Sequence, residues 1–209
     1  IYPSQEATLA DAQLHKMSTI CQRLELTADD HLLEIGTGWG GLAIYAAQHY
    51  GCKVTTTTIS DAQYEYAKNR IEQLGLDDKI TLLKQDYRDL TGEYDKLVSI
   101  EMIEAVGFEY LPSFFKQCNE RLKPGGKLLI QSITIADQRF EHYKHNVDFI
   151  QRYIFPGGFL PSITVLTQNL TQYTDLVTES INDIGLDYAR TLADWREAFL
   201  QSWPELIPY

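Results

Sequence analysis

The sequence predicts an α/β fold in which one parallel β-sheet is covered by helices on both faces. Short apolar or β-branched runs alternate with amphipathic runs five times between residues 31 and 135. A group of close-set glycines follows the first of these runs. Polar motifs follow several others, at what would be the carboxyl edge of the sheet, where folds of this class bind their ligands.

The composition restricts the class of protein. The chain has 209 residues, 44% hydrophobic and 22% charged, as expected for one globular domain with a core. Its net charge of −11 disfavours nonspecific binding to nucleic acid and broad adhesion to anionic lipid. Local contact with a lipid is compatible with this charge. Three widely spaced cysteines favour a reducing, cytoplasmic setting. No apolar run suits a membrane span or signal peptide, and no His, Cys and acidic residues have metal-ligand spacing.

The first predicted element is an amphipathic helix within residues 1–30. Apolar residues recur at helical spacing and are expected to form its buried face: Ala10, Leu14, Met17, Cys21 and Leu24. Five strands are then expected at His31–Ile35, Lys53–Thr58, Lys79–Lys84, Asp95–Ile100 and Lys127–Ile135. The segment Lys123-Pro-Gly-Gly126 is interpreted as the stop before the fifth strand.

Helices are predicted between these strands. Their expected inner faces are Leu42, Ile44, Tyr45 and Ala47; Ala62, Tyr66, Ile71 and Leu74; and Leu111, Phe114, Phe115, Cys118 and Leu122. Ser60 can cap the second of them, and Gly75 can end it. Apolar residues at Leu192, Trp195, Phe199 and Trp203 predict a last helix within residues 186–209.

The stretch HLLEIGTGWGGLA, from His31 to Ala43, is predicted to bind a nucleoside. Its glycines let the backbone approach a ligand closely, and the following helix presents free N–H groups. The G-x-G-x-G spacing differs from the dinucleotide fingerprint G-x-G-x-x-G, and Trp39 would crowd a pyrophosphate. An acidic residue, Glu34, precedes the turn. The predicted ligand is therefore a nucleoside without a pyrophosphate.

Residues 136–185 interrupt the alternation and are rich in aromatic side chains: Phe140, Tyr143, Phe149, Tyr153, Phe155 and Phe159. We interpret them as a cap of short helices laid over the end of the sheet. Two interpretations stay open for this cap. It is either a satellite core beneath a long loop or the wall of an apolar substrate pocket.

Several segments together resemble one enzyme family: EIGTGWGG, TTTTIS-x-x-Q, LKQDYRDL, SIEMIEAVG, RLKPGG, FIQRYIFPGGFLPS and DIGLDYARTL-x-x-W. Their combination is similar to the cyclopropane-fatty-acyl-phospholipid synthases and the mycolic acid cyclopropane synthases, and EMIEAVG and ITIADQRF resemble the branch that includes plant-type synthases. The resemblance implies a class I S-adenosylmethionine-dependent methyltransferase, Rossmann-like, with the aromatic-rich cap inserted after the fifth strand. One catalytic domain would cover residues 1–209, with an N-terminal helix region (1–30), a cofactor-binding sheet core (31–135), a substrate cap (136–185) and a C-terminal helix (186–209).

The resemblance implies S-adenosylmethionine as the cofactor. The turn would hold its methionine part through backbone groups, and Thr58 and Gln63 would bind the ribose with neutral hydrogen bonds. Asp86 would accept from the exocyclic amine of adenine, and Tyr87 would stack on the ring. The other members of the implied cofactor site are Gly36, Thr37, Gly38, Trp39, Gly40, Ile59 and Glu101. Without the resemblance, an exposed helix residue is the favoured interpretation of Gln63. A polar turn after a strand is then an equal alternative for Asp86 and Tyr87.

The implied reaction adds a methylene across the double bond of an unsaturated phospholipid acyl chain. The alkene attacks the sulfonium methyl, a carbocation forms, and a base removes a proton so that the ring closes. The implied base is a bound bicarbonate, held by Glu104, Tyr188 and the backbone N–H of Ile133. Gln131 stands where the family has a histidine; it can donate a hydrogen bond but cannot carry a positive charge.

Tyr153 is assigned to the acyl slot, where its ring would orient the bicarbonate or face the cation. From the residues alone, other interpretations stay open for the implied catalytic set. Glu104 is also compatible with a helix-start carboxylate, Tyr188 with a phenol at the core edge, and Gln131 with a strand-end amide.

Three other functions compete with ring formation. A related fatty-acyl C-methyltransferase would leave a methyl or methylene branch on the same alkene, and the departure at Gln131 keeps this alternative open. Methyltransferases acting on oxygen, nitrogen or small molecules are disfavoured by the aromatic cap and by the absence of a catalytic His or Lys near the site. A non-catalytic module that binds cofactor or lipid is the alternative from another class.

The chain is expected to be the catalytic core of a longer protein. It begins at Ile1 and lacks the Tyr-Ser element that family members carry upstream, and only residues 174–184 could supply a strand of the terminal hairpin. Alone it is expected to bind cofactor weakly or not at all, which calorimetry can check. The expected partner is an unsaturated phospholipid acyl chain, with peripheral membrane contact of a cytoplasmic protein and a homodimer as one candidate assembly.

Overall fold

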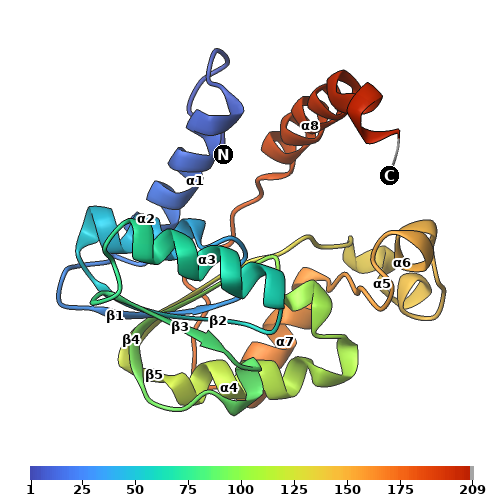
Figure 1. The fold of residues 1–209 in the computed structure, drawn as a ribbon. Coiled ribbons are helices and arrows are strands. Elements are labelled where there is room, and N and C mark those ends of the chain that lie inside the picture. The colour runs from blue at the N-terminus through green and yellow to red at the C-terminus, as the bar shows by residue number, and fades with distance from the viewer. Residues whose placement is uncertain (208–209) are drawn as a thin grey trace. The chain divides into compact units, whose positions relative to one another are not determined.

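The computed structural model describes residues 1–207, which group into two compact units. One unit, Arg23–Thr178, contains the whole β-sheet. The other combines Ile1–Gln22 with the described part of Glu179–Tyr209. Figure 1 labels the elements of both units. The arrangement of residues 1–209 as one catalytic domain stays a prediction.

The sheet has five parallel strands in the order β3-β2-β1-β4-β5 (Figure 1). The strands are β1 His31–Ile35, β2 Lys53–Thr58, β3 Ile80–Lys84, β4 Tyr94–Ile100 and β5 Leu122–Gln131. The chain leaves β1 toward β2 on one side and later returns to pair β4 on the other side. The predicted parallel α/β fold is confirmed, and its switch point lies at the carboxyl ends of β1 and β4, where ligands of such sheets bind.

Strand β5 begins earlier than the sequence predicted. Tyr94 pairs with Leu122 and Lys96 pairs with Lys127. The segment 123–126, expected as the stop before the fifth strand, is therefore a bulge within β5 opposite Asp95. The bulge needs glycine at 126, because a Cβ there would lie 2.9 Å from the carbonyl oxygen of Asp95. The strand ends at Gln131, and the predicted extension to Ile135 is wrong.

Helices cover both faces of the sheet: α2 Gly41–Tyr50 and α3 Asp61–Gln73 lie on one, and α4 Leu111–Arg121 lies on the other (Figure 1). The predicted inner face of α4 is confirmed for four residues that are buried, Leu111, Phe114, Phe115 and Cys118, whereas Leu122 lies outside the helix and begins β5. These side chains form the core beneath β1 and β4.

The predicted inner face of α3 is confirmed only at Ile71, and Ala62, which also belongs to the prediction, is exposed. Ala67 and Ile71 are its buried residues, whereas Tyr66 and Leu74 are exposed. The glycine turn accounts for the difference, because a Cβ on Gly40 would lie only 3.2 Å from the Cβ of Ala67. Only a small side chain fits at that contact, so α3 turns Ala67 inward and leaves Tyr66 outside.

The predicted cap contains α5 Asp137–Lys144, α6 Phe149–Tyr153 and α7 Ile163–Tyr173. Phe140, Tyr143 and Phe159 are buried in the same cluster as Leu33 and Phe114, so they extend the main core and do not form a separate satellite core. The aromatic residues of α6 are exposed instead. No strand forms between 174 and 184. There Thr174 donates to the carbonyl of Leu170 and accepts from the N–H of Leu176, a local turn that competes with an extended strand.

The smaller unit contains most of α1 Leu9–Arg23, together with α8 Gly185–Leu206. On α1 the predicted face is partly wrong, since Leu14 is exposed and Ala12 and Ile20 are buried. The guanidinium of Arg190 lies 3.9 Å from the ring centre of Tyr2, whose hydroxyl donates to Asp194 at 2.7 Å. Among residues 1–207, no helix combines the length and apolar character that crossing a bilayer requires.

Candidate active site

The glycine turn joins β1 to α2 and faces open space. Gly36, Gly38 and Gly40 have φ of +102°, +52° and +80°, which other residues rarely adopt. The N–H groups of Gly36 and Thr37 donate to the carbonyl of Thr57, which fixes the turn against β2. A Cβ added at Gly38 would meet nothing within 4 Å. The backbone at Gly38 is therefore open to a ligand.

A buried carboxyl supports this turn from beneath. Glu34 accepts a hydrogen bond from the hydroxyl of Thr56 at 2.6 Å, and that hydroxyl lies 2.7 Å from the hydroxyl of Thr37. Complete burial raises the pKa of Glu34 to about 8. Sequence reasoning noted Glu34 but gave it no role. The available signal was an acidic residue inside an otherwise apolar run.

Glutamine at position 34 should reduce the pH dependence of stability. The folded protein keeps a proton on Glu34 up to pH about 8, whereas the unfolded chain releases it near the ordinary value of 4.5, so folding weakens as pH rises between these values. The loss is about 1.4 kcal/mol per pH unit in this window. Urea unfolding at pH 5 and pH 8 should show a flatter profile for Glu34→Gln. Glu93→Gln, which changes an exposed glutamate, is the control and should keep the wild-type pH dependence. If the free energy of unfolding changes with pH equally in Glu34→Gln and the wild type, this account is contradicted.

The predicted ribose residues contact each other. The hydroxyl of Thr58, at the end of β2, donates to Oε1 of Gln63 at 2.8 Å. Ser60 caps α3 by accepting from the backbone N–H of Gln63, as the sequence predicted for this serine. Ile59, 74% exposed, and Trp39, 57% exposed, present apolar surface beside these groups in the sequence. Trp39 packs edge-on against Tyr66, with ring centres 5.2 Å apart.

The two residues predicted to bind adenine already have protein partners. Arg88 holds both carboxylate oxygens of Asp86, at 2.9 and 2.7 Å, and its hydrogen bonds lower the pKa of that carboxyl. The ring of Tyr87 packs edge-on against Phe114 at 5.5 Å, on the edge of the core. Their roles toward adenine stay predictions.

Four predicted residues meet where β4 and β5 end. The backbone N–H of Ile133 donates to Oε1 of Glu104 at 2.6 Å. The amide of Gln131 donates to Oε1 of Glu101 at 2.6 Å, and the N–H of Glu101 donates to the carbonyl of Gln131 at 2.9 Å. Glu101 has φ of +51°, a strained value for a residue other than glycine. The structure thus brings Glu101, Glu104, Gln131 and Ile133 into one cluster.

The second carboxylate oxygen of Glu104 is the least satisfied atom of this cluster. Oε2 is buried and has no hydrogen-bond partner within the part of the chain that the structure describes. Desolvation by burial raises the pKa of Glu104, and the nearby charge of Glu101 adds to this effect. Because buried polar atoms in native proteins are nearly always paired, Oε2 is an acceptor that a donor on a bound ligand could fill, beside the hydroxyl of Ser132, which lowers the pKa of this carboxyl.

The cluster and the glycine turn are neighbours. A Cβ on Gly36 would lie 3.3 Å from the side chain of Met102, which belongs to the same loop as Glu104. In addition, Ser99 of β4 donates to the carbonyl of Ile35 at 3.1 Å. The loops after β1 and β4 therefore face one another at the switch point of the sheet.

Two further predicted catalytic residues, Tyr153 and Tyr188, belong to other elements. Tyr153 on α6 is 64% exposed, and its ring packs against Phe149 at 5.1 Å. Tyr188 belongs to α8 of the smaller unit, where its ring lies edge-on to Trp195 at 6.4 Å. Both roles stay predictions.

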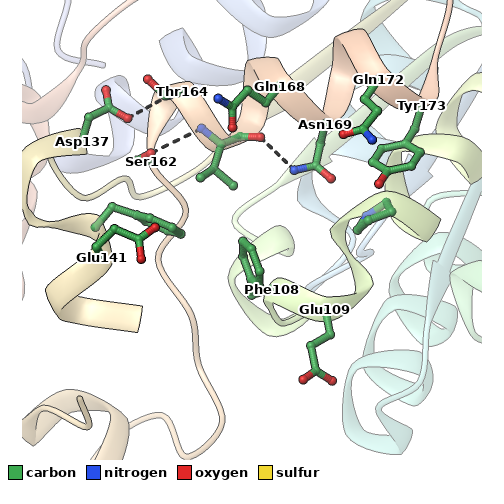
Figure 2. Close-up of a pocket in the computed structure, with 13 residues that line it drawn as sticks. Phe108, Glu109, Asp137, Glu141, Ser162, Thr164, Gln168, Asn169, Gln172 and Tyr173 are labelled. Carbon is green, nitrogen blue, oxygen red and sulfur yellow. Dashed lines mark hydrogen bonds between the residues drawn. The ribbon is translucent and has the colours of Figure 1, made fainter. Parts of the chain in front are cut away.

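A groove of about 500 Å³ lies elsewhere, between the 3-10 helix Phe108–Tyr110, α5 and α7. Figure 2 shows Phe108 at the groove, with the amide groups of Gln168 and Asn169 on the α7 side. Asn169 donates to the carbonyl of Val165 within α7. The groove is lined by none of the individually assigned cofactor or catalytic residues, but most of its lining, Phe140 included, belongs to the predicted substrate cap, residues 136–185.

Comparison with known proteins places the chain in a family. The family model described as "Mycolic acid cyclopropane synthetase" matches residues 1–209. The chain belongs to this family. It is 41% identical over 199 residues to the cyclopropane-fatty-acyl-phospholipid synthase of Escherichia coli, covering 95% of this chain and 49% of that protein. It is 39% identical over 193 residues to tuberculostearic acid methyltransferase UfaA1 of Mycobacterium tuberculosis, covering 92% of this chain and 45% of that protein.

Solved structures of the cyclopropane synthetase family confirm the predicted fold. The cyclopropane synthase MmaA2 of Mycobacterium tuberculosis superposes with a TM-score of 0.90 at 26% identity, covering 99% of this chain and 75% of that chain. The mycolic acid cyclopropane synthase CmaA1, solved with SAH and CTAB, gives a TM-score of 0.88 at 24% identity, covering 97% of this chain and 74% of that chain. The fold is that of the S-adenosylmethionine-dependent methyltransferases. The chain spans about half the length of the curated relatives it matches.

Proposed function

We propose that the protein transfers a methylene from S-adenosylmethionine to the double bond of an unsaturated phospholipid acyl chain, forming a cyclopropane ring. The observation that carries this proposal is the buried, unpaired Oε2 of Glu104, beside the backbone of Ile133 and next to the glycine turn. A base is needed there, because ring closure removes a proton from the newly added methyl group. The relative named cyclopropane-fatty-acyl-phospholipid synthase supports ring formation, and the relative named tuberculostearic acid methyltransferase supports the transfer of a methyl group.

The residues around the turn fit S-adenosylmethionine, which supplies an electrophilic methyl group when bound. The open face at Gly38 admits a ligand against the backbone, and the N-terminus of α2 offers N–H groups. Thr58 and Gln63 present a hydroxyl and an amide that can pair with ribose hydroxyls. Glu34, held neutral by burial, supports the turn without placing a negative charge beneath it.

Bicarbonate fits the orphaned acceptor, because its hydroxyl can donate to Oε2 of Glu104. The backbone N–H of Ile133 holds Oε1 of the same carboxylate and so fixes the direction of Oε2. Bicarbonate held in this way would supply the base, and Glu104 would orient it. Depletion of bicarbonate from the full-length protein should then lower turnover, and its return should restore it.

A related fatty-acyl C-methyltransferase is the second candidate, and the pairing of Gln131 with Glu101 favours it. One N–H of the Gln131 amide is used by a carboxylate, so the pair adds negative charge beside Glu104. An anionic base is held less tightly in such surroundings. The cation would then lose a different proton, leaving a methyl or methylene branch. A relative named probable fatty acid methyltransferase, from Pseudomonas putida, is 36% identical over 193 residues.

Mass spectrometry of lipids from cells that express the full-length protein separates the candidates. Ring formation adds one CH2, removes the double bond and gives ring fragments. A retained double bond or an open methyl branch would support the second candidate. Unchanged lipids, with S-adenosylmethionine bound to the purified protein, would contradict both.

A further inference from the structure

A short segment of the cap, residues 159–161, is hydrogen-bonded to the two parts of the chain that surround Glu104. The N–H of Phe159 donates to the backbone carbonyl of Glu104 at 2.8 Å. The carbonyl of Pro161 accepts from the N–H of Ile135 at 3.0 Å. We call residues 159–161 the strap, because they connect the loop after β4 to the segment after β5.

Both contacts of the strap lie next to the bond that fixes the carboxylate of Glu104. The N–H of Ile133, two residues before Ile135, donates to Oε1 of Glu104 at 2.6 Å. The strap therefore supports both ends of this side chain, the main chain of Glu104 directly and Oε1 through the segment that contains Ile133. The direction of the unpaired Oε2 depends on both supports.

Tyr143 of α5 holds the middle of the strap. Its hydroxyl accepts from the N–H of Leu160 at 3.1 Å, and its ring packs against that of Phe159, with ring centres 6.2 Å apart. Tyr143 is 8% exposed and belongs to the core cluster. A buried hydroxyl is costly unless it is paired. Because a phenylalanine ring would fill the same space in the core, the hydroxyl of Tyr143 serves the contact with the strap.

A second anchor lies just beyond the strap, where α7 begins. Oδ1 of Asp137 accepts from the N–H of Thr164 at 3.0 Å (Figure 2). Ser162, buried at the N-terminus of α7, accepts from the N–H of Val165 at 3.3 Å. Asp137 is the first residue of α5, the helix that also contains Tyr143. The strap and the chain that follows it are therefore held at two points of one helix.

We propose that Tyr143 is a positioning residue for the reaction: it holds the strap through the N–H of Leu160, and the strap keeps Oε2 of Glu104 directed at the place of the base. Tyr143 itself contacts neither cofactor nor substrate in this account. The proposal rests on the proposed function for the role of Glu104. The link from Tyr143 to Glu104 is a property of the fold and is measured without turnover.

Hydrogen exchange in the full-length protein measures this link directly. In Tyr143→Phe the N–H of Leu160 loses its acceptor, so the strap should open more often, and the amides of residues 133–135 should exchange severalfold faster. These amides are far from position 143 in the chain and do not contact its hydroxyl, so the change must pass through the strap. Wild-type exchange at residues 133–135 in Tyr143→Phe would overturn the proposal.

The matched control is Tyr173→Phe. It removes the hydroxyl of a tyrosine on α7 that is 39% exposed, and it should leave exchange at residues 133–135 as in the wild type. Thermal unfolding followed by circular dichroism shows whether each variant is folded at the assay temperature. Faster exchange of the same size in Tyr173→Phe would show that loss of any hydroxyl nearby loosens the segment, which contradicts the role of Tyr143.

The exposed anchor provides a second variant in case Tyr143→Phe fails to fold. Asp137→Ala removes the acceptor of the Thr164 N–H at a side chain that lies on the surface. It should speed exchange at residues 133–135 in the same direction, by a smaller factor. With Tyr143→Phe unfolded, unchanged exchange there in Asp137→Ala would overturn the proposal.

Kinetics separate positioning from a loss of stability. In Tyr143→Phe, kcat should fall about tenfold because Glu104 is misplaced, while KM for phospholipid and the Kd for S-adenosylmethionine stay as in the wild type. The acidic limb of the kcat profile should also move to lower pH. Burial raises the pKa of Glu104, with the charge of Glu101 adding to it, and a looser Glu104 is better solvated. A lower kcat with an unmoved limb would contradict positioning, because a loss of folded enzyme gives that result.

The proposed function and the positioning role can fail separately. If the wild type forms no product from phospholipid but Tyr143→Phe speeds exchange at residues 133–135, the proposed function fails and the link to Glu104 stands. If the wild type forms product and Tyr143→Phe keeps both the wild-type exchange and the wild-type kcat, the proposed function stands and the positioning role is wrong.

Discussion

Replacement of Glu104 by glutamine is expected to abolish product formation in the full-length protein while S-adenosylmethionine still binds. Glutamine keeps an acceptor for the N–H of Ile133 but places an amide where the orphaned Oε2 lies. The group that should hold or act as the base then becomes a donor and loses its charge. A loss of about 100-fold to 10,000-fold is expected for removal of base catalysis, measured as product formed per hour by lipid mass spectrometry.

The matched control for this prediction is Glu109→Gln. Glu109 is an exposed glutamate on the 3-10 helix Phe108–Tyr110, a few residues further along the same chain segment. It should keep full activity. Calorimetry should show the same affinity for S-adenosylmethionine in both variants and the wild type. Persistent product in Glu104→Gln would remove Glu104 from the catalytic assignment.

Alanine at position 38 is expected to weaken binding of S-adenosylmethionine by tenfold or more. Gly38 combines a φ of +52° with open space around an added Cβ, so the protein itself has room for the methyl group. A ligand bound against the backbone would occupy the space that the added methyl group needs. A tenfold loss corresponds to about 1.4 kcal/mol. Calorimetric titration of the full-length variant measures it.

Gly75→Ala provides the control for the backbone strain at Gly38. Gly75 follows α3, has φ of +64° and also has nothing within 4 Å of an added Cβ. Both substitutions force alanine into the left-handed region and should lower stability by about 1–2 kcal/mol. Only Gly38→Ala should lose cofactor affinity. Equal affinities in the two variants would show that the cofactor does not approach the turn at Gly38.

Much of the fold could be predicted because its strands are short apolar runs and α4 has a regular apolar face. Leu111, Phe114 and Cys118 recur at helical spacing and are all buried. The inner face of α3 could not be predicted in this way. There a close approach between Gly40 and Ala67 decides which residue turns inward, and periodicity contains no information about that contact.

The candidate site shows the same division. The resemblance assigned Thr58 and Gln63 to the ribose, and Glu104 and Ile133 to bicarbonate. The two members of each pair are in hydrogen-bond contact with each other, and their roles toward those ligands stay predictions. The pairing of Glu101 with Gln131 was not predicted, because it joins the ends of two strands that are far apart in the chain. The positions of Tyr153 and Tyr188 relative to Glu104 depend on the cap and on a second unit, which no local pattern determines.

The pairing of Glu101 with Gln131 has a consequence for protein engineering. A histidine introduced at 131 would face a carboxylate that favours its protonated form, so it would donate from both ring nitrogens. Glu101 also has a left-handed backbone conformation that suits glycine. Glu101→Gly is therefore the exchange with the least backbone strain, and it also removes the carboxylate. Positions 101 and 131 therefore form one unit of substitution, so an exchange at 131 should be tested together with an exchange at 101.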